Sequence, residues 1–267
     1  MFGQARVGLR TAFERDVDAA LARVAPVQPV VDADLAPLPE PVQRYLRVAG
    51  VVGQPRVANV YARMHGRIRN GRAARWIPLT AEQYNVASPP SRFFYLHGSM
   101  FAVPVHGYHR YVGASAAMTV KAAGLVTIAD AAGEEMTISE TVTLFNDMCI
   151  LAPAMLLDAP IVWEPVDARS TRARFSNAGH TIGATLSFAE SGELVDFRSD
   201  DRRQIAPDGR VAKKMGWSTP LAAYRWFGSV RLASGGEARW HEPDGDYAYI
   251  ELTFDAVQYN VRWRWRS

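Results

Sequence analysis

The sequence is poor in cysteine, in lysine and in long apolar runs, and each shortage excludes a class of structure. Cys149 is the only cysteine, so the chain can form neither an internal disulfide nor a cysteine-based zinc site. No apolar run approaches the roughly 20 residues that a membrane-spanning helix needs. Of the 30 basic side chains, only Lys121, Lys213 and Lys214 are lysines, so the basic character comes from guanidinium groups.

Several recognisable motifs are missing as well. The first 25 residues lack the apolar stretch of a signal peptide, because Arg6, Arg10, Arg15 and Arg23 are interleaved with acidic side chains. A cytoplasmic location is therefore expected. The sequence contains no Gly-rich phosphate loop before a helix and no His-Glu-x-x-His. We therefore predict neither a cofactor nor a metal.

What is present describes a folded globular protein. The chain has 267 residues, of which 48% are hydrophobic, and a formal net charge of +3. This hydrophobic content excludes a disordered chain. The length suits one large β domain or two small ones and is sufficient to bury most of the apolar surface.

The N-terminal region has the pattern of a helix followed by a linker. In residues 4–24, Leu9, Phe13 and Val17 recur at helical spacing, with charged residues between them. Residues 25–41 carry five prolines, which favour extended backbone. Pro41 then suits the first turn of a short helix that ends before Gly50. We therefore divide the chain into an N-terminal helix with its linker, residues 1–35, and one β domain, residues 36–267.

From Val57 onward, apolar and polar residues alternate, which is typical of half-buried antiparallel strands. Residues 61–69 are the clearest case, because four basic side chains fall on one face and apolar or small residues on the other. Similar alternation occupies residues 172–175, 181–188, 248–255 and 261–266. The pattern predicts about five or six strands before residue 134 and about six or seven after residue 157.

Residues 134–157 have helical spacing instead and are apolar on most sides. Ile138, Val142 and Phe145 recur along one row, Thr137 with Glu140 suggests a capping box, and Pro153 should kink or end the helix. A long sheet with one apolar face must curl, and an apolar helix belongs under that curl. We therefore predict an α+β, mostly β fold: a strongly curved antiparallel sheet, or half-barrel, wrapped around a central helix at about residues 137–157.

A series of short segments runs along the chain over roughly residues 38–260. It consists of LPEPVQRYLR (38–47), WIP (76–78) with EQY (82–84), RYV (110–112), GLV (124–126), LFNDMC (144–149), WEPVD (163–167), SDDR (199–202), WSTP (217–220) and GEARW (236–240). In this order the segments resemble an uncharacterised bacterial family of unknown function, which implies no reaction. The order of strands and helix is also similar to the half-barrel of lipoprotein carriers and related hydrophobic-ligand binders, a likeness that concerns the fold. A secreted carrier would carry a signal peptide, whose pattern the first 25 residues lack.

Residues 93–111 hold the densest group of aromatic and histidine side chains. If the flanking strands form a hairpin at the edge of the sheet, these rings close the mouth of a pocket, where His97 would serve as general acid or base. Alternatively, His97, His106 and His109 are ordinary residues hydrogen-bonded to the backbone. A metal site is disfavoured, because two histidines three residues apart on a strand point to opposite faces.

Two carboxylates stand out among apolar neighbours. Burial of Asp147 in the apolar helix would raise its pKa and suit it to proton transfer. However, Glu140, Thr143 and Asp147 share one helical stripe, and we favour the alternative that this stripe faces water. Asp201 falls on the apolar face of its strand if the register holds, with Arg203 as its partner, unless a bulge turns it outward.

Arginine-rich strand faces invite a nucleic-acid interpretation, with Arg63, Arg67 and Arg69 as the first example. The net charge is only +3, and Glu251 and Asp255 occupy the polar face of a nearby predicted strand. Cross-strand ion pairs on a solvated outer face therefore explain the pattern better. We predict no nucleic-acid partner and no stable membrane insertion.

The leading hypothesis for function is that the half-barrel binds a hydrophobic or aromatic small molecule, or a lipid, between the sheet and the central helix. The predicted ligand-binding residues are Tyr84, Phe94, His97, Tyr108, Tyr111, Phe145, Met148 and Trp217. The first alternative is an enzyme of the same architecture, of isomerase, cyclase or lyase type, with His97, Asp147 or Asp201 as acid or base. A second is an interaction module that docks through its N-terminal helix. In a third, side chains fill the interior completely and no ligand binds. The sequence does not indicate the oligomeric state.

Overall fold

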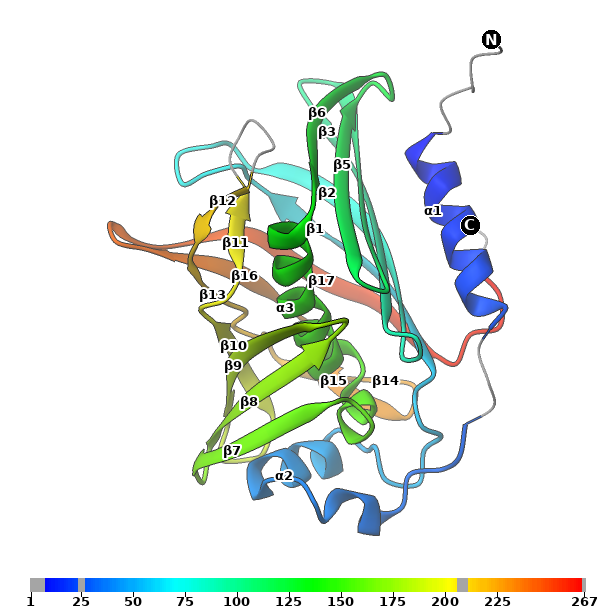
Figure 1. Ribbon diagram of the computed structural model, residues 1–267, viewed down its shortest axis with the longest axis vertical. Coiled ribbons are helices and arrows are strands. Elements are labelled where there is room, and N and C mark those ends of the chain that lie inside the picture. The colour runs from blue at the N-terminus through cyan, green and yellow to red at the C-terminus, as the bar shows by residue number, and fades with distance from the viewer. Residues whose placement is uncertain (1–7, 24–26, 206–210, 266–267) are drawn as a thin grey trace.

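A computed structural model of the protein describes residues 8–23, 27–205 and 211–265. In this part of the chain, 13 strands form one antiparallel sheet that curves around a long helix without closing into a barrel (Figure 1). The predicted fold class is therefore confirmed. The strand order across the sheet is β6-β5-β4-β3-β2-β1-β17-β16-β13-β10-β9-β8-β7.

The sheet consists of two runs of hairpins joined by the last strand. The first run comprises β1 (Asn59–Ile68), β2 (Ile77–Val86), β3 (Ser91–Met100), β4 (Val103–Val112), β5 (Ser115–Ala122) and β6 (Val126–Ala132). The second comprises β7 (Ile161–Asp167), β8 (Ser170–Asn177), β9 (His180–Phe188), β10 (Leu194–Ser199), β13 (Gly216–Ser218), β16 (Gly235–Glu242) and β17 (Gly245–Tyr259). β17 pairs with β1, so the C-terminal strand connects the two halves.

Four further strands lie outside the main sheet. β11 (Arg203–Ile205) pairs with β12 (Val211–Lys214), and β14 (Tyr224–Phe227) pairs with β15 (Val230–Ala233). β11 lies near the long helix, because the Ser139 hydroxyl donates to the carbonyl of Arg203 at 3.2 Å.

The outer face of the sheet carries the cross-strand ion pairs that the alternation predicts. Nε of Arg67 donates to Glu251 at 2.7 Å, and His65 lies 2.8 Å from Asp255. Both pairs join β1 to β17. This part of the arginine-rich face is therefore ion-paired surface, as expected for a solvated sheet. Arg69 instead donates to the backbone carbonyls of Ala248 and Arg72.

The C-terminal segment differs from the prediction. Residues 261–265 form no strand, because β17 ends at Tyr259 and Asn260 has a left-handed backbone with φ of 54°. This reversal brings the following residues against the convex face. There the Trp265 amide donates to the Tyr84 hydroxyl at 2.8 Å.

The central helix, α3 (Glu134–Leu151), is followed by a 3-10 turn, η2 (Pro153–Leu157). Pro153 marks the end of α3, as the sequence indicates. The predicted capping box is wrong, because the helix begins one turn earlier, at Glu134, and the Thr137 hydroxyl donates to the Gly133 carbonyl at 2.9 Å. Almost every residue of α3 is buried, since the curved sheet surrounds it (Figure 1).

The N-terminal elements attach to two different places. α1 (Leu9–Leu21) packs on the convex face of β2, β3 and β4, where Phe13 and Val17 are fully buried. η1 (Asp32–Leu35) and α2 (Glu40–Val48) lie against the main core, to which Val30, Leu35 and Tyr45 contribute. The apolar face of α1 is thus buried against the sheet. It is not free to dock onto a partner, as the interaction-module alternative requires. None of the helices within the described ranges is both long and apolar enough to span a bilayer.

Candidate functional site

A cavity of about 760 Å³ lies on the concave side of the sheet, next to α3. Its wall is mostly apolar and includes Met64, Leu79, Phe94, Leu96, Val105, Met118, Val120, Ile250, Leu252 and Phe254. Alternation along each strand explains this set, since Phe94 and Leu96 of β3 point inward while Tyr95 between them points outward. The cavity reaches the exposed side chains of Met100 and Ile128 near the hairpin ends.

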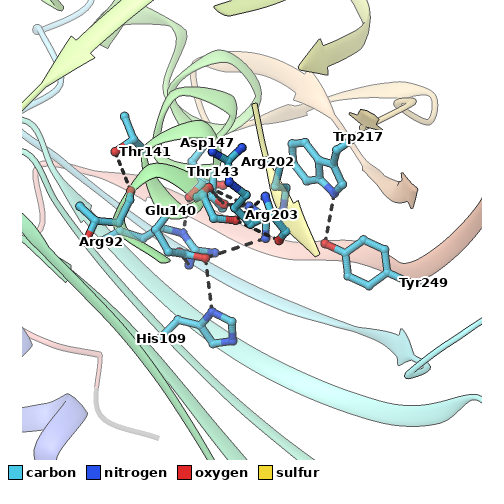
Figure 2. A network of polar contacts seen from close by, with 12 residues as sticks. Arg92, His109, Glu140, Thr141, Thr143, Asp147, Arg202, Arg203, Trp217 and Tyr249 are labelled. Carbon is cyan, nitrogen blue, oxygen red and sulfur yellow. Dashed lines mark hydrogen bonds and ion pairs between the residues drawn. The ribbon is translucent and has the colours of Figure 1, made fainter. Parts of the chain in front are cut away.

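A group of charged side chains interrupts this apolar wall where β3 faces α3 (Figure 2). Nε of Arg92 donates to Oδ2 of Asp147 at 2.6 Å, and Nη1 donates to Oε2 of Glu140 at 3.0 Å. Oδ2 of Asp147 also accepts hydrogen bonds from Gln83 at 2.7 Å and from Asn85 at 3.1 Å. Arg92 thus ties two acidic residues of the helix to the sheet.

Two further basic side chains approach Glu140 from other elements. His109 of β4 lies 3.6 Å from Oε1 of Glu140, and Nη2 of Arg202 lies 3.8 Å from the same oxygen (Figure 2). Arg202 follows β10, and its guanidinium stacks on the Trp217 ring at 4.6 Å. Nη1 of Arg202 donates to the Ser139 carbonyl at 3.1 Å and to the Thr143 hydroxyl.

The two buried carboxyl groups have opposite pKa shifts. Burial disfavours the charged form of both. For Glu140, the attraction of Arg92, His109 and Arg202 outweighs burial and holds the pKa well below its usual range. For Asp147, burial and the nearby charge of Glu140 outweigh Arg92 and Asn85, so the pKa is raised. Asp147 is therefore the group of this pair that takes up a proton first as the pH falls.

Three of the predicted site residues line the cavity. Asp147, Phe94 and Trp217 all contribute to its wall. The favoured alternative that the stripe of Glu140, Thr143 and Asp147 faces water is wrong, because all three side chains are buried. The helix is surrounded by sheet, so this stripe meets Arg92 instead of solvent.

Tyr84, Tyr108 and His97 do not line the cavity, which corrects their predicted placement. Tyr84 and Tyr108 point to the convex face, where they pack with Phe13 of α1. His97 also points to that face and is exposed, with its ring 4.8 Å from that of His106. Alternation assigns the residues of a strand to two faces. It does not reveal that the outer face is apolar here as well, because α1 covers it.

Tyr111, Phe145 and Met148 are buried on the concave side but do not line the cavity. Phe145 stacks on Phe175 at 5.1 Å, and Met148 belongs to the same core. The Tyr111 hydroxyl lies 3.0 Å from that of Thr141. These residues fill the closed part of the half-barrel.

Asp201 also lies outside the cavity wall. Its carboxylate accepts hydrogen bonds from the Gly183 amide at 2.7 Å and pairs with Lys214 at 2.6 Å, so Lys214 replaces the predicted partner Arg203. The expected register is broken, because a bulge lies between Leu194 and Asp196 and β10 ends at Ser199. His97, Asp147 and Asp201 therefore do not share one site.

The sequence-based reasoning missed Arg92 and Arg202 as members of the site, and it chose His97 instead of His109 from the histidines of residues 93–111. Arg92 had a signal, since it shares the inward face of β3 with Phe94 and Leu96. Arg202 had none, because strand alternation puts it on the face opposite to Asp201 and so on the outside, whereas the chain leaves β10 three residues earlier.

A serine, a histidine and an aspartate are also linked on the other face of the sheet. His241 lies 2.9 Å from the Ser218 hydroxyl and 2.7 Å from Asp246. Ser218 is only 2% exposed, so a substrate cannot reach it. The arrangement joins β13, β16 and β17 rather than forming a nucleophilic site. In the described ranges, no group of three or more His, Cys, Asp or Glu side chains could hold a metal.

The model of a protein family matches residues 28–252, which span both halves of the sheet and α3. The chain belongs to DUF6544, a family of unknown function. No curated protein shows detectable similarity to this DUF6544 chain.

Solved structures with a similar fold are distant in sequence. A putative outer membrane lipoprotein-sorting protein domain from Vibrio parahaemolyticus is 9% identical, with a TM-score of 0.43, and the match covers 76% of this chain and 85% of that one. A DUF1329 family protein from Desulfovibrio piger is 12% identical, with a TM-score of 0.43 and coverage of 88% and 95%. A LolA superfamily protein from Nitrosomonas europaea is 8% identical, with a TM-score of 0.34 and coverage of 82% and 93%. At these identities and TM-scores the likenesses say nothing about the ligand of this chain.

Proposed function

We propose that the protein binds a hydrophobic or aromatic small molecule, or a lipid, in the concave cavity. The observation that carries this proposal is the space of about 760 Å³ between the sheet and α3. Ligand sites typically enclose about 300–1,000 Å³ and combine apolar walls with a few polar groups. This cavity has both features, since the Arg92 cluster interrupts a wall of aliphatic and aromatic side chains.

The cavity also speaks against the alternative of a completely filled interior. Phe145, Phe175 and Phe197 fill the half of the barrel near β8 and β10. In the half enclosed by β1 to β5, side chains such as Leu79, Leu96 and Val120 line open space. A hydrophobic ligand in this space would cover apolar wall that otherwise faces water, so its binding would stabilise the fold.

Two measurements test this proposal. Native mass spectrometry of the purified protein should show an additional mass that is lost on denaturation. The neutral dye N-phenyl-1-naphthylamine should gain fluorescence on binding to ligand-stripped protein. Val120→Trp, which adds a ring to the cavity wall, should weaken dye binding about tenfold or more, equivalent to about 1.4 kcal/mol.

Lys121→Trp is the matched control, because the neighbouring position is absent from the cavity wall. It should bind the dye as the unmodified protein does. A folded protein that carries no additional mass and does not bind the dye would refute the proposal.

A second candidate function is acid/base catalysis on such a ligand, as in an isomerase, cyclase or lyase. Asp147 supports it, because this buried carboxyl group with a raised pKa lies in the cavity wall. All three of its hydrogen bonds from described residues go to Oδ2, which leaves Oδ1 for a proton.

The enzyme candidate predicts hydrogen exchange. Incubation of the co-purified molecule with the protein in D₂O should introduce deuterium at carbon, and Asp147→Asn should abolish this exchange while the protein still folds and binds the dye. Exchange that Asp147→Asn leaves unchanged would exclude Asp147 as the acid or base.

Location in the cytoplasm and the lack of a nucleic-acid partner are further proposals, to be checked by cell fractionation and by oligonucleotide titration at low salt.

A further inference from the structure

Oε1 of Glu140 has two loosely held ion-pair partners in the cavity wall. Oε1 of Glu140 lies 3.6 Å from Nδ1 of His109 and 3.8 Å from Nη2 of Arg202. Both separations exceed hydrogen-bond length. Glu140, His109 and Arg202 all line the cavity, and Figure 2 shows the contacts between them.

Glu140 and Arg202 both have unused bonding capacity. Glu140 is 1% exposed, and within the described chain its hydrogen bond from Arg92 goes to the other oxygen, Oε2. The Arg202 side chain is 12% exposed, and its Nη1 is already engaged by Ser139 and Thr143. Its Nε is buried and has no hydrogen-bond partner among the described residues. Buried charged groups with unfilled positions are costly, so a ligand atom that completes them gains binding energy.

Building on the proposed function, we propose that the ligand is a hydrophobic alcohol whose hydroxyl oxygen lies in the cavity against Glu140, His109 and Arg202. An oxygen on the cavity side of each pair, off the line that joins its two atoms, lies about 2.8 Å from both of them. The hydroxyl donates its proton to Oε1 of Glu140. Its lone pairs accept from Nη2 of Arg202 and from His109 in the tautomer that is protonated at Nδ1.

Other head groups fit this point less well. A carboxylate has no proton to donate and would face the ionised Glu140. An ammonium group has no lone pair and would face Arg202. An ether accepts but cannot donate, so Glu140 would remain unfilled. Only a group that both donates and accepts satisfies an anion and a cation at once.

The surroundings of this point suit the hydrocarbon part of such an alcohol. The His109 ring meets Phe94 edge to face at 5.7 Å, and Arg202 is stacked on Trp217. From there the cavity wall continues through Leu96, Met118 and Val120. A long aliphatic chain or a ring system is therefore the class of body that this hydroxyl would carry.

The test uses four ligands that share one chain: 1-dodecanol, methyl dodecyl ether, dodecanoate and dodecylamine. Each displaces N-phenyl-1-naphthylamine from the ligand-stripped protein in a fluorescence titration. We expect the alcohol to bind about tenfold or more tightly than the ether, the acid or the amine, since the site is built to pair with a hydroxyl.

Two variants locate the hydroxyl. His109→Phe and Arg202→Met should each weaken alcohol binding. The ratio of the dissociation constants for ether and alcohol should therefore fall toward one. His97→Phe is the control, because His97 points to the convex face and should leave the preference unchanged. If Arg202→Met does not fold, the four-ligand series on the unmodified protein and His109→Phe still decide the question.

The outcomes separate this inference from the proposal on which it rests. Equal binding of alcohol and ether, or tighter binding of the acid or the amine, would overturn the hydroxyl site and leave hydrophobic-ligand binding intact. A stripped protein that binds neither the dye nor any of the four ligands would refute both.

Discussion

Asp147 of the central helix and Arg92 of β3 are joined by a 2.6 Å hydrogen bond inside the curved sheet. Arg92 also donates to Glu140 at 3.0 Å. Glu140 lies two helical turns before Asp147 on α3. One guanidinium therefore fixes both the position and the rotation of α3 relative to the sheet. The same contacts set the polar end of the cavity.

Removing Arg92 should be strongly destabilising. Arg92→Met leaves Glu140 and Asp147 buried without their shared cation, and such a loss costs about 3–5 kcal/mol of the free energy of unfolding. Urea denaturation measures it. Arg67→Met is the control, since its pair with Glu251 is exposed and should contribute little to the free energy of unfolding. Similar losses in the two variants would show that the Arg92 pairs are not specially stabilising.

Asp196 should make stability fall as the pH rises. Its Oδ1 is buried without a partner among the described residues, and burial raises its pKa to about 6 from 3.8. The folded state therefore binds more protons than the unfolded state between these values, and this stabilisation is lost above about pH 6.

Asp196→Asn should remove that dependence and, at pH 8, raise the free energy of unfolding by about 1 kcal/mol relative to the unmodified protein. Urea denaturation at pH 4.5 and at pH 8 measures the difference. Asp200→Asn makes the same change on an exposed side chain and is the control. If Asp196→Asn and the unmodified protein differ in stability by the same amount at both pH values, the raised pKa of Asp196 is contradicted.

Phe13 should hold α1 on the sheet. Its ring lies 5.5 Å from that of Tyr95, 5.7 Å from Tyr108 and 6.0 Å from Tyr84. Phe13→Ala should destabilise by about 3 kcal/mol and increase amide hydrogen exchange in residues 9–21. Dye binding should be unchanged, because this cluster lies on the face opposite the cavity. Thr11→Ala, at an exposed position of the helix, should have little effect on either measurement.

Replacing the two residues of the turn between β3 and β4 should stabilise the protein. Phe101 and Ala102 both have left-handed backbones, with φ of 51° and 63°, and Phe101 is 81% exposed. Two-residue hairpin turns of this kind favour Asn-Gly. Phe101→Asn combined with Ala102→Gly should therefore stabilise the protein by about 1 kcal/mol, seen as a higher Tm. A lower Tm would show that Phe101 contributes contacts that outweigh the backbone strain.

Much of the fold could be predicted from local patterns. Alternation in residues 181–188 matches β9, where Ile182, Leu186 and Phe188 are buried. Helical spacing and Pro153 located α3 and its end. These signals work because strand and helix periodicities record directly which side chains are buried. The 261–266 strand was wrong, since alternation does not reveal that the backbone turns at Asn260.

The site was less predictable, because its members come from distant parts of the chain. Asp147 and Arg92 are 55 residues apart, so the sequence near Asp147 contains no sign of its partner. Tyr84 and Tyr108 belong to an apolar face that exists only because α1 covers it. Local pattern identifies two faces of a strand but not which face encloses a cavity.

The sequence by itself determined the curved antiparallel sheet, the central helix and the ion-paired outer surface, because each follows from the spacing of neighbouring residues. Only the tertiary structure decided that the stripe of Glu140, Thr143 and Asp147 is buried. It also brought Arg92, His109 and Arg202 to that stripe and left open space beside them. The physical reason is that burial and pKa depend on what packs against a side chain, and for this helix those partners come from β3, from β4 and from the segment after β10.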